Sequence, residues 1–237
     1  MMSAQRNPQR MFITLEGIEG AGKSTLMPFV VDLLKRRGHD CLVTREPGGT
    51  GIGRRIREIL LDPESRDIHP HTELLLYFAD RTQHAREKIL PALEAGRTVV
   101  CDRFVDATIV YQGIARGLGR DLVEDLHGLM LDNLKPDLTL LFDLPPRVGL
   151  SRAWRQLQNG VRAAAESRFE SETITFHEKV RAGYLSLATS EPHRYRILDA
   201  SGDIPSVETQ VRRILDDWMA DRSKPPAASG TGAPSIS

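Results

Sequence analysis

The chain has 237 residues, of which 40% are hydrophobic and 27% are charged, and its 32 basic residues balance its 32 acidic residues. This length and composition are typical of a globular domain with a sizeable core. A chain without net charge lacks the cation excess of a general nucleic-acid or membrane-surface binder, although it can still form a local basic pocket.

Other features indicate the compartment. No apolar run approaches the roughly 18 residues of a membrane span. The polar N-terminus, residues 1–10, lacks the apolar core of a signal peptide. Cys41 and Cys101 lie at apparent strands without C-x-x-C spacing, which favours buried thiols in a reducing compartment. We therefore expect a cytoplasmic protein.

The first predicted strand and helix, residues 11–16 and 25–37, flank a glycine-rich loop. The loop fits the phosphate-binding pattern G-x-x-x-x-G-K-[ST]; its residues, the candidate ATP-binding set together with Thr25, are Gly17, Ile18, Glu19, Gly20, Ala21, Gly22, Lys23 and Ser24. Glycines let backbone N–H groups surround an anion, and the helix N-terminus adds partial positive charge. The motif assigns Lys23 to the β- and γ-phosphates and the Ser24 hydroxyl to Mg²⁺.

Strands and helices alternate along the rest of the chain. The further expected strands are residues 41–44, 97–102, 138–143 and 195–199. Helices are expected around residues 52–60, 73–88, 107–114, 121–130, 146–150, 169–188 and 207–219. Asp121 is expected to be an N-cap, with Glu124 at the capping-box position. This alternation predicts an α/β protein with a P-loop NTPase fold, in which helices flank both faces of a five-stranded parallel sheet.

Ligands bind beyond the carboxyl ends of such strands, so the polar residues there are the candidates for chemistry. Asp102 closes an apolar strand and is expected to serve Mg²⁺, unless it is only a turn residue. Arg45 and Arg103 follow two different strands and suit a second phosphate, unless they form surface salt bridges.

Two further candidates are less specific. Arg81 follows Tyr77 by one helical turn, and such a pair can stack on a base and hydrogen-bond it; on sequence alone, a solvated arginine and core aromatics are the simpler interpretation. The arginine-rich stretch 152–168 is too polar for core and is interpreted as a mobile lid over the leaving phosphate, or as a surface loop.

Together these residues resemble the thymidylate kinase family over about residues 11–219. The stretches that carry the resemblance are residues 12–25, 44–50, 102–104, 111–113, 135–139 and 168–170, and the Thr-Arg-Glu-Pro-Gly-Gly-Thr stretch at 44–50 is the most specific. The resemblance implies a homodimer that transfers phosphate from ATP to dTMP with Mg²⁺. We also expect one kinase domain at residues 11–221 with a lid at about 151–168, preceded by a flexible N-terminal extension (1–10). Because Pro, Ala, Ser and Gly dominate from Ser223 onward, a disordered tail is expected at residues 222–237.

The resemblance also implies residue roles. Lys23, Arg103 and a lid arginine would be catalytic, and Ser24, Asp102 and Glu170 would serve the metal. Glu19 would hold the sugar 3′-hydroxyl, Arg45 and Arg103 the 5′-phosphate, and Arg81 the thymine edge. The remaining dTMP contacts would be Tyr77, Thr108, Tyr111 and Gln112.

The sequence departs from the family pattern in two places. Tyr77 replaces the phenylalanine that stacks on the base, so its hydroxyl needs a partner. The lid is longer than expected and carries Ser167 where aspartate is usual. Because Gly20 occupies the position where other members place a P-loop arginine, the lid must supply it; Arg155 is our choice over Arg152 and Arg162.

Three alternatives remain open at this point. The first is a kinase for another nucleoside monophosphate or for a deoxynucleoside, which an acceptor panel would reveal. The second is a P-loop regulatory ATPase that hydrolyses ATP without an acceptor, although the pair Arg45 and Arg103 argues against this. A binding-only relative is disfavoured by the presence of Lys23, Ser24 and Asp102.

Overall fold

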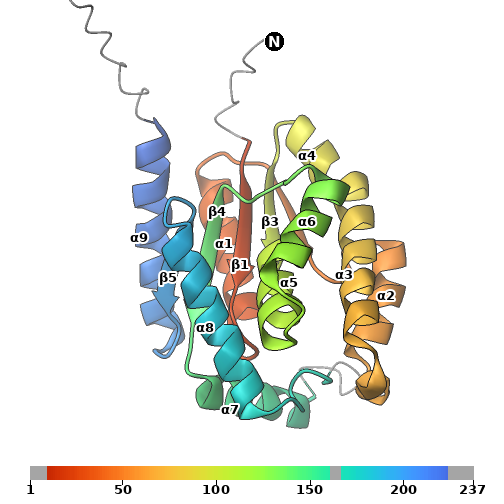
Figure 1. Cartoon of the computed structure of the whole chain (residues 1–237). Coiled ribbons are helices and arrows are strands. Elements are labelled where there is room, and N and C mark those ends of the chain that lie inside the picture. Colours follow the sequence, from red (N-terminus) through yellow and green to blue (C-terminus); the bar gives the residue numbers. More distant parts are fainter. Residues whose placement is uncertain (1–9, 161–166, 224–237) are drawn as a thin grey trace, which may run out of the picture.

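A five-stranded sheet forms the centre of the computed structural model, which describes residues 10–160 and 167–223 (Figure 1). The strands are β1 (Phe12–Glu16), β2 (Cys41–Arg45), β3 (Thr98–Asp102), β4 (Leu138–Asp143) and β5 (Tyr195–Asp199). Their order is β2-β3-β1-β4-β5, and all four neighbouring pairs are parallel. The predicted parallel α/β sheet is thus confirmed.

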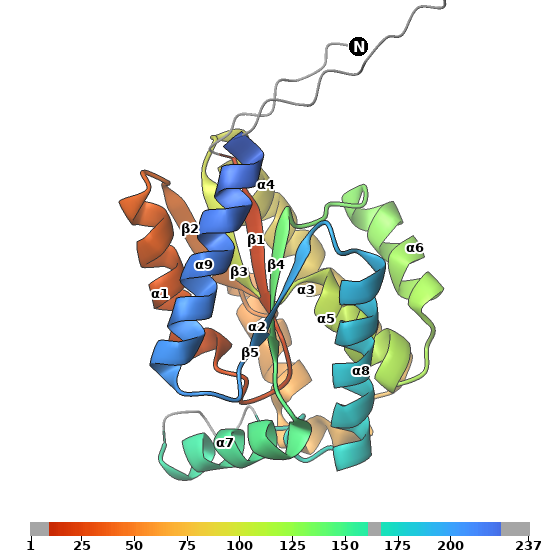
Figure 2. The ribbon, with the colours of Figure 1, turned by 90° about the vertical axis from the view of Figure 1, so that its left-hand side faces the viewer.

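Helices cover both faces of this sheet. They are α1 (Lys23–Arg36), α2 (Gly51–Leu61), α3 (Pro70–His84), α4 (Leu90–Glu94), α5 (Val105–Thr108), α6 (Arg120–Leu131), α7 (Pro146–Gln158), α8 (Ile174–Ser190) and α9 (Ile204–Ser223), with a 3₁₀ turn η1 (Pro63–Asp67) and π-helical segments η2 (Ala85–Ile89) and η3 (Ile109–Ala115). Figure 2 shows α1 and α9 on one side of the sheet and α5, α6 and α8 on the other. The central strands are covered twice, so all five residues of β1 are buried.

The carboxyl ends of the strands bring the predicted site residues together. The register pairs Asp102 with Leu15 on one side and with Arg45 on the other. The glycine-rich loop follows β1 directly and leads into α1. Helix α7 lies across this end of the sheet (Figure 1). The phosphate loop, Asp102 and the arginines Arg45 and Arg103 therefore all lie at the edge that α7 crosses.

Two details of the predicted helices are wrong. Helix α6 begins at Arg120 with Gly119 as its N-cap (φ 93°), and Asp121 lies in its first turn. Glu124 accepts a hydrogen bond from Arg120 (2.9 Å), so no capping box forms. The apolar spacing of residues 121–130 predicts Leu129 on the core side of this helix, but Leu129 is 76% exposed, and the buried stripe of α6 consists of Val123, His127 and Leu131.

The predicted lid is partly helical. Helix α7 continues to Gln158 rather than ending near residue 150, and α8 begins at Ile174 rather than at Phe169. Arg168 and Phe169 lie in the turn before α8 rather than in the helix, and both side chains are buried against the domain. Residues 161–166, with the candidate Arg162, and most of the expected tail and N-terminal extension lie outside the described residues.

Candidate active site

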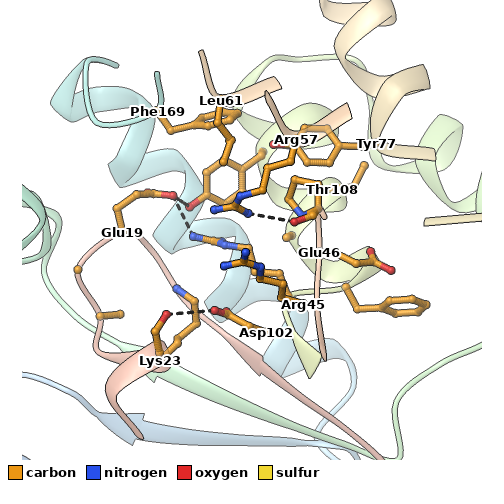
Figure 3. A pocket seen from close by; sticks show the side chains of 18 of the residues that line it. Glu19, Lys23, Arg45, Glu46, Arg57, Leu61, Tyr77, Asp102, Thr108 and Phe169 are labelled. Carbon is orange, nitrogen blue, oxygen red and sulfur yellow. Dashed lines mark hydrogen bonds and ion pairs between the residues drawn. The ribbon is translucent and has the colours of Figure 1, made fainter. Parts of the chain in front are cut away.

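A single pocket at the carboxyl ends of the strands is lined by both halves of the predicted site. The phosphate loop contributes residues 19–25, and Asp102 lies beside it (Figure 3). All eight residues expected to contact dTMP also line the pocket: Glu19, Arg45, Tyr77, Arg81, Arg103, Thr108, Tyr111 and Gln112. Loop and acceptor residues, which come from distant parts of the chain, therefore face one space.

The phosphate loop presents backbone donors and one ammonium group. Gly20 and Gly22 have positive φ values, 70° and 91°, which allow the loop to turn tightly. No side chain caps α1, so the N–H groups of its first turn can serve a ligand. Lys23 donates from Nζ to the carbonyl oxygens of Gly17 (2.9 Å) and Ile18 (3.0 Å). Burial and the charge of Arg103 lower the pKa of Lys23 to about 8. The negative charge of a bound polyanion would raise this pKa again and keep the ammonium group protonated.

The loop packs tightly against the first turns of α7. A Cβ added at Gly20 would lie 2.0 Å from the carbonyl oxygen of Gly149, and one added at Gly149 would lie 2.4 Å from that of Glu19. A P-loop arginine could not occupy position 20 in this arrangement. Gly149, which the sequence analysis did not identify, is therefore part of the loop's support.

Two of the predicted metal ligands are adjacent. The Ser24 hydroxyl donates to Oδ2 of Asp102 (3.3 Å), and Oδ1 of Asp102 is buried without a hydrogen-bond partner in the described part of the chain. Glu170 is buried in the turn before α8 and is not among the pocket-lining residues. Within residues 10–160 and 167–223, no cluster of three or more His, Cys, Asp or Glu residues is arranged to hold a metal.

A buried network fixes Arg103 and Glu19 opposite each other. Oε1 of Glu19 accepts from Arg103 Nη2 (2.9 Å) and from the Tyr111 hydroxyl (2.7 Å), and Arg103 lies over the Tyr111 ring. Arg103 itself has φ 68°, a left-handed conformation that is costly for a non-glycine residue and that concentrates at functional sites. The Tyr184 hydroxyl accepts from Arg103 Nη1 (3.2 Å).

His177 completes this network from α8. Its Nε2–H donates to the Phe169 carbonyl (3.0 Å), and its Nδ1 lies 3.2 Å from Oε2 of Glu19. Burial alone would lower the pKa of His177, but the contact with Glu19 raises it overall. Burial would likewise raise the pKa of Glu19, yet Arg103 and His177 hold it well below its usual value. The Glu19 carboxylate is therefore charged and immobilised.

Arg81 is buried rather than solvated, so the simpler sequence interpretation is wrong for this residue. Its exposed fraction is 1%. Its Nε donates to Oε2 of Glu46 (2.8 Å), and its Nη2 donates to the Phe104 carbonyl (3.2 Å) and the Thr108 hydroxyl (2.8 Å). In the part of the chain that the structure describes, Nη1 is buried without a partner.

The partners of Arg81 explain residues that sequence reasoning missed. Glu46, within the Thr-Arg-Glu-Pro-Gly-Gly-Thr stretch, also contacts His84 Nδ1 through its Oε1 (2.8 Å).

The two aromatic residues next to each other in α3 have different surroundings. Phe78 is core at 3% exposure, whereas Tyr77 is half-buried at the pocket wall. Burial and the charge of Glu73 raise the pKa of Tyr77 above its usual value, so its hydroxyl stays neutral.

The two candidate lid arginines that the structure describes, Arg152 and Arg155, are not among the residues that line the pocket. Arg152 donates to the carbonyl oxygens of Ala200 (2.8 Å) and Ser201 (3.0 Å). Arg155 is exposed and does not line the pocket, whereas its neighbour Gln156 does. The structure adds one arginine that the sequence analysis missed, Arg57 of α2, which lines the pocket with Arg45 and Arg103. The helical spacing of the isoleucines in this stretch predicts α2 itself but gives no signal for Arg57.

The sheet order, the phosphate loop after the central strand and the facing arginine-lined half define a P-loop kinase of the nucleoside monophosphate type. A sequence model of the thymidylate kinase family matches residues 15–211. The chain is 58% identical over 204 residues to the thymidylate kinase of Desulfosudis oleivorans, covering 86% of this chain and 94% of that protein. It is 48% identical to that of Geobacter sulfurreducens, covering 86% and 95%.

The chain belongs to the thymidylate kinase family. It is therefore a phosphotransferase of nucleotide biosynthesis, and its reaction is the phosphorylation of dTMP to dTDP. The family implies ATP as co-substrate. Membership of this family excludes the alternative of a P-loop regulatory ATPase. Among the helices of residues 10–160 and 167–223, none combines the length and apolar character needed to cross a bilayer.

Proposed function

We propose that this enzyme transfers the γ-phosphoryl group of Mg²⁺-bound ATP directly to the 5′-phosphate of dTMP, across the pocket between the phosphate loop and the arginine-lined half. The observation that carries the proposal is the shared pocket itself, which is lined by residues 19–25 and by all eight expected acceptor residues. Direct transfer needs no strong general base, because a phosphate monoester is already largely dianionic at neutral pH. The protein must instead bring two polyanions into line.

Donor binding is assigned to the phosphate loop. The N–H groups of the loop and of the first turn of α1 would hold the phosphates, and Lys23 would exchange its loop carbonyls for phosphate oxygens. Ser24 and Asp102 offer hard oxygen ligands, and the unpartnered Oδ1 of Asp102 suits a magnesium ion whose other ligands are phosphate oxygens and water. When bound, the ion would neutralise charge on the transferring group. Glu170 remains a proposed outer partner of the metal.

Acceptor phosphate binding is assigned to Arg103 and Arg45, with Arg57 added. Arg103 is held rigidly by Glu19 and Tyr184, so little side-chain freedom is lost when it binds an anion. Arg45 and Asp102 are register partners in the sheet, which places the arginine next to the proposed metal ligand. The three guanidinium groups would offset the repulsion between the two substrates.

Sugar and base binding are assigned to the far end of the pocket. Glu19 would accept from the 3′-hydroxyl, and the Tyr111 ring would pack against the deoxyribose. Tyr77 would stack on the base. Nη1 of Arg81, held in a fixed fork, would donate to the base carbonyl at C4, which cytosine replaces with an amino donor.

The catalytic lid arginine stays a prediction, with Arg155 as our choice. Arg152 is engaged by the segment after β5, and Arg168 is buried against Glu73 (2.7 Å). Arg155 is exposed on the last turns of α7 and is next to Gln156, which lines the pocket, so the proposal requires a movement of this helix end that brings Arg155 to the bound phosphates.

A homodimer in the cytoplasm completes the proposal. Leu75 of α3 and Leu129 of α6 are 57% and 76% exposed, on helices that contact each other, and such apolar side chains favour a partner surface. Two free, buried cysteines suit a reducing compartment. Light scattering on the wild type and on Leu129→Glu tests the dimer; an unchanged mass would place the interface elsewhere.

The experiment that tests the proposed function is an ADP-release assay with dTMP, dUMP, dCMP, dGMP and thymidine as acceptors, with and without Mg²⁺. We expect Mg²⁺-dependent turnover with dTMP and little with dCMP, dGMP or thymidine. ADP release that does not depend on an acceptor, or a preference for another monophosphate, would contradict the proposal.

A further inference from the structure

Glu73 is a buried carboxylate in α3 that touches the base end of the pocket only through another residue. It is 1% exposed. Its Oε1 accepts from Gln112 Nε2 (2.6 Å) and from Arg116 Nε (3.5 Å), and its Oε2 accepts from Arg168 Nη2 (2.7 Å). Guanidinium groups only donate, so both oxygens of Glu73 act as acceptors.

This contact determines which end of the Gln112 amide faces the pocket. An amide has a donor end, NH₂, and an acceptor end, the carbonyl oxygen. The carboxylate takes the donor end, so the oxygen of Gln112 is directed away from Glu73. In the described part of the chain this oxygen accepts no hydrogen bond, and Gln112 lines the pocket.

The orientation matters because pyrimidines differ at N3. Thymine and uracil carry N3–H, which is a donor, whereas N3 of cytosine is an acceptor. An amide oxygen facing the base pairs with the first and opposes the second. Combined with Nη1 of Arg81, which is proposed above to donate to the carbonyl at C4, the pocket would offer an acceptor beside a donor, the complement of thymine.

We infer that Glu73 is a positioning residue that sets pyrimidine selectivity by holding the amide oxygen of Gln112 toward the base. The inference rests on the proposed role of Gln112 in base binding. Glu73 contacts no substrate itself. Because its other oxygen holds Arg168, at the end of the lid segment, the same carboxylate also fixes the turn before α8.

The variant Glu73→Gln tests this directly. A glutamine of the same size can either accept from or donate to Gln112, so both orientations of the Gln112 amide become accessible. We expect the ratio of kcat/KM for dTMP to kcat/KM for dCMP to fall by about 10-fold or more, the size of one mispaired buried hydrogen bond. An unchanged ratio in an active variant would overturn the inference.

Glu172→Gln is the matched control. Glu172 accepts from Arg116 (2.5 Å), as Glu73 does, but has no contact with Gln112 among those that the structure describes. It removes one carboxylate from the same group of charges, and the dTMP-to-dCMP ratio should stay at the wild-type value. A fall equal to that of Glu73→Gln would assign the effect to charge loss and overturn the inference.

A neutron crystal structure of the wild-type chain with dTMP gives an answer even if Glu73→Gln does not fold. The inference expects the deuterated nitrogen of Gln112 on Glu73 and its oxygen within hydrogen-bonding distance of N3. The reverse orientation, in an enzyme that phosphorylates dTMP, would overturn the inference and leave the proposed function intact. A wild type that does not bind dTMP in this pocket would overturn both.

Discussion

The two halves of the pocket recognise their ligands by different means. The phosphate loop uses backbone N–H groups, glycines with positive φ and one lysine, all within eight consecutive residues. The acceptor half uses side chains from separate elements, and three of them are held by a buried carboxylate: Arg81 by Glu46, Arg103 by Glu19, and Gln112 by Glu73. Backbone recognition suits the phosphates that all nucleotides share, whereas oriented side chains can read a particular base.

The difference predicts how each half fails. Damage to the loop should lower the rate of transfer for every acceptor. Damage to a buried partner in the acceptor half should change which monophosphate is used, while ATP binding persists.

Lys23→Ala should have the largest effect. Removing the ammonium group leaves the β- and γ-phosphate charge without its main protein cation, so kcat should fall by about 1,000-fold or more. Binding of dTMP, measured by calorimetry, should remain within a few-fold of the wild type, because Lys23 is not among the proposed dTMP contacts. Lys35→Ala, an exposed lysine on the same helix, is the control; wild-type turnover by the Lys23 variant would remove the phosphate-loop assignment.

Arg81→Lys should separate the halves most clearly. Lysine keeps the charge next to Glu46 but loses the fork that reaches Thr108 and leaves Nη1 for the base. We expect kcat/KM for dTMP to fall roughly 100-fold with little change in the KM for ATP. The exposed Arg86→Lys should behave like the wild type, and an equal rise in the KM for ATP would show that the two halves are not independent.

Gly20→Ala should damage the loop by sterics. Its Cβ would lie 2.0 Å from the Gly149 carbonyl oxygen, so the backbone must shift. Gly38→Ala is the matched control, because Gly38 also has positive φ (86°) but its added Cβ meets nothing within 4 Å. The control should cost about 1–2 kcal/mol of unfolding free energy. The Gly20 variant should lose more stability and also show a raised KM for ATP; equal losses in the two variants would contradict the packing argument.

Glu16→Gln should change how the unfolding free energy depends on pH. Glu16 accepts from the Phe104 amide (2.8 Å) and the Tyr184 hydroxyl (2.7 Å), and burial, followed by the charge of Asp106, raises the pKa of Glu16 from 4.5 to about 8. Between pH 4.5 and about 8 the folded state therefore holds a proton on Glu16 that the unfolded state has lost. The contribution of Glu16 to the unfolding free energy accordingly falls as the pH rises through this range.

The measurement is the unfolding free energy in urea between pH 5 and 8. The Gln variant should remove a negative slope of up to about 1.4 kcal/mol per pH unit, whereas Glu94→Gln, at an exposed position, should leave it unchanged. Parallel curves for the wild type and Glu16→Gln would show that Glu16 is ionised in the folded protein.

The same contrast explains what could be predicted from the sequence. The phosphate loop is contiguous, so its residues and the flanking strand and helix follow from local pattern. Arg45, Asp102 and Arg103 follow from strand ends, because parallel strands end at one edge. The partners that orient the acceptor side chains, Glu46 and Glu73, could not be found in this way, since nothing local links them to their arginine or glutamine.

Helix α3 shows why hydrophobic periodicity failed there. Its buried stripe contains Glu73, Asp80, Arg81 and His84, which are buried together because they pair with groups on other elements. The apolar spacing of residues 73–88 predicts Leu75 on the core side of the helix, yet Leu75 is 57% exposed. A prediction that places apolar residues in the core and charged residues at the surface assigns the wrong buried face to such a helix. It therefore also misses the buried charged residues that form the substrate site.

A crystal structure of the full chain with dTMP and ADP bound together tests the central claim most directly. The account predicts that the dTMP phosphate contacts Arg45 and Arg103 and faces the ADP β-phosphate near Lys23, with no residue between them. A monophosphate bound far from Lys23, or on a different surface of the protein, would contradict it.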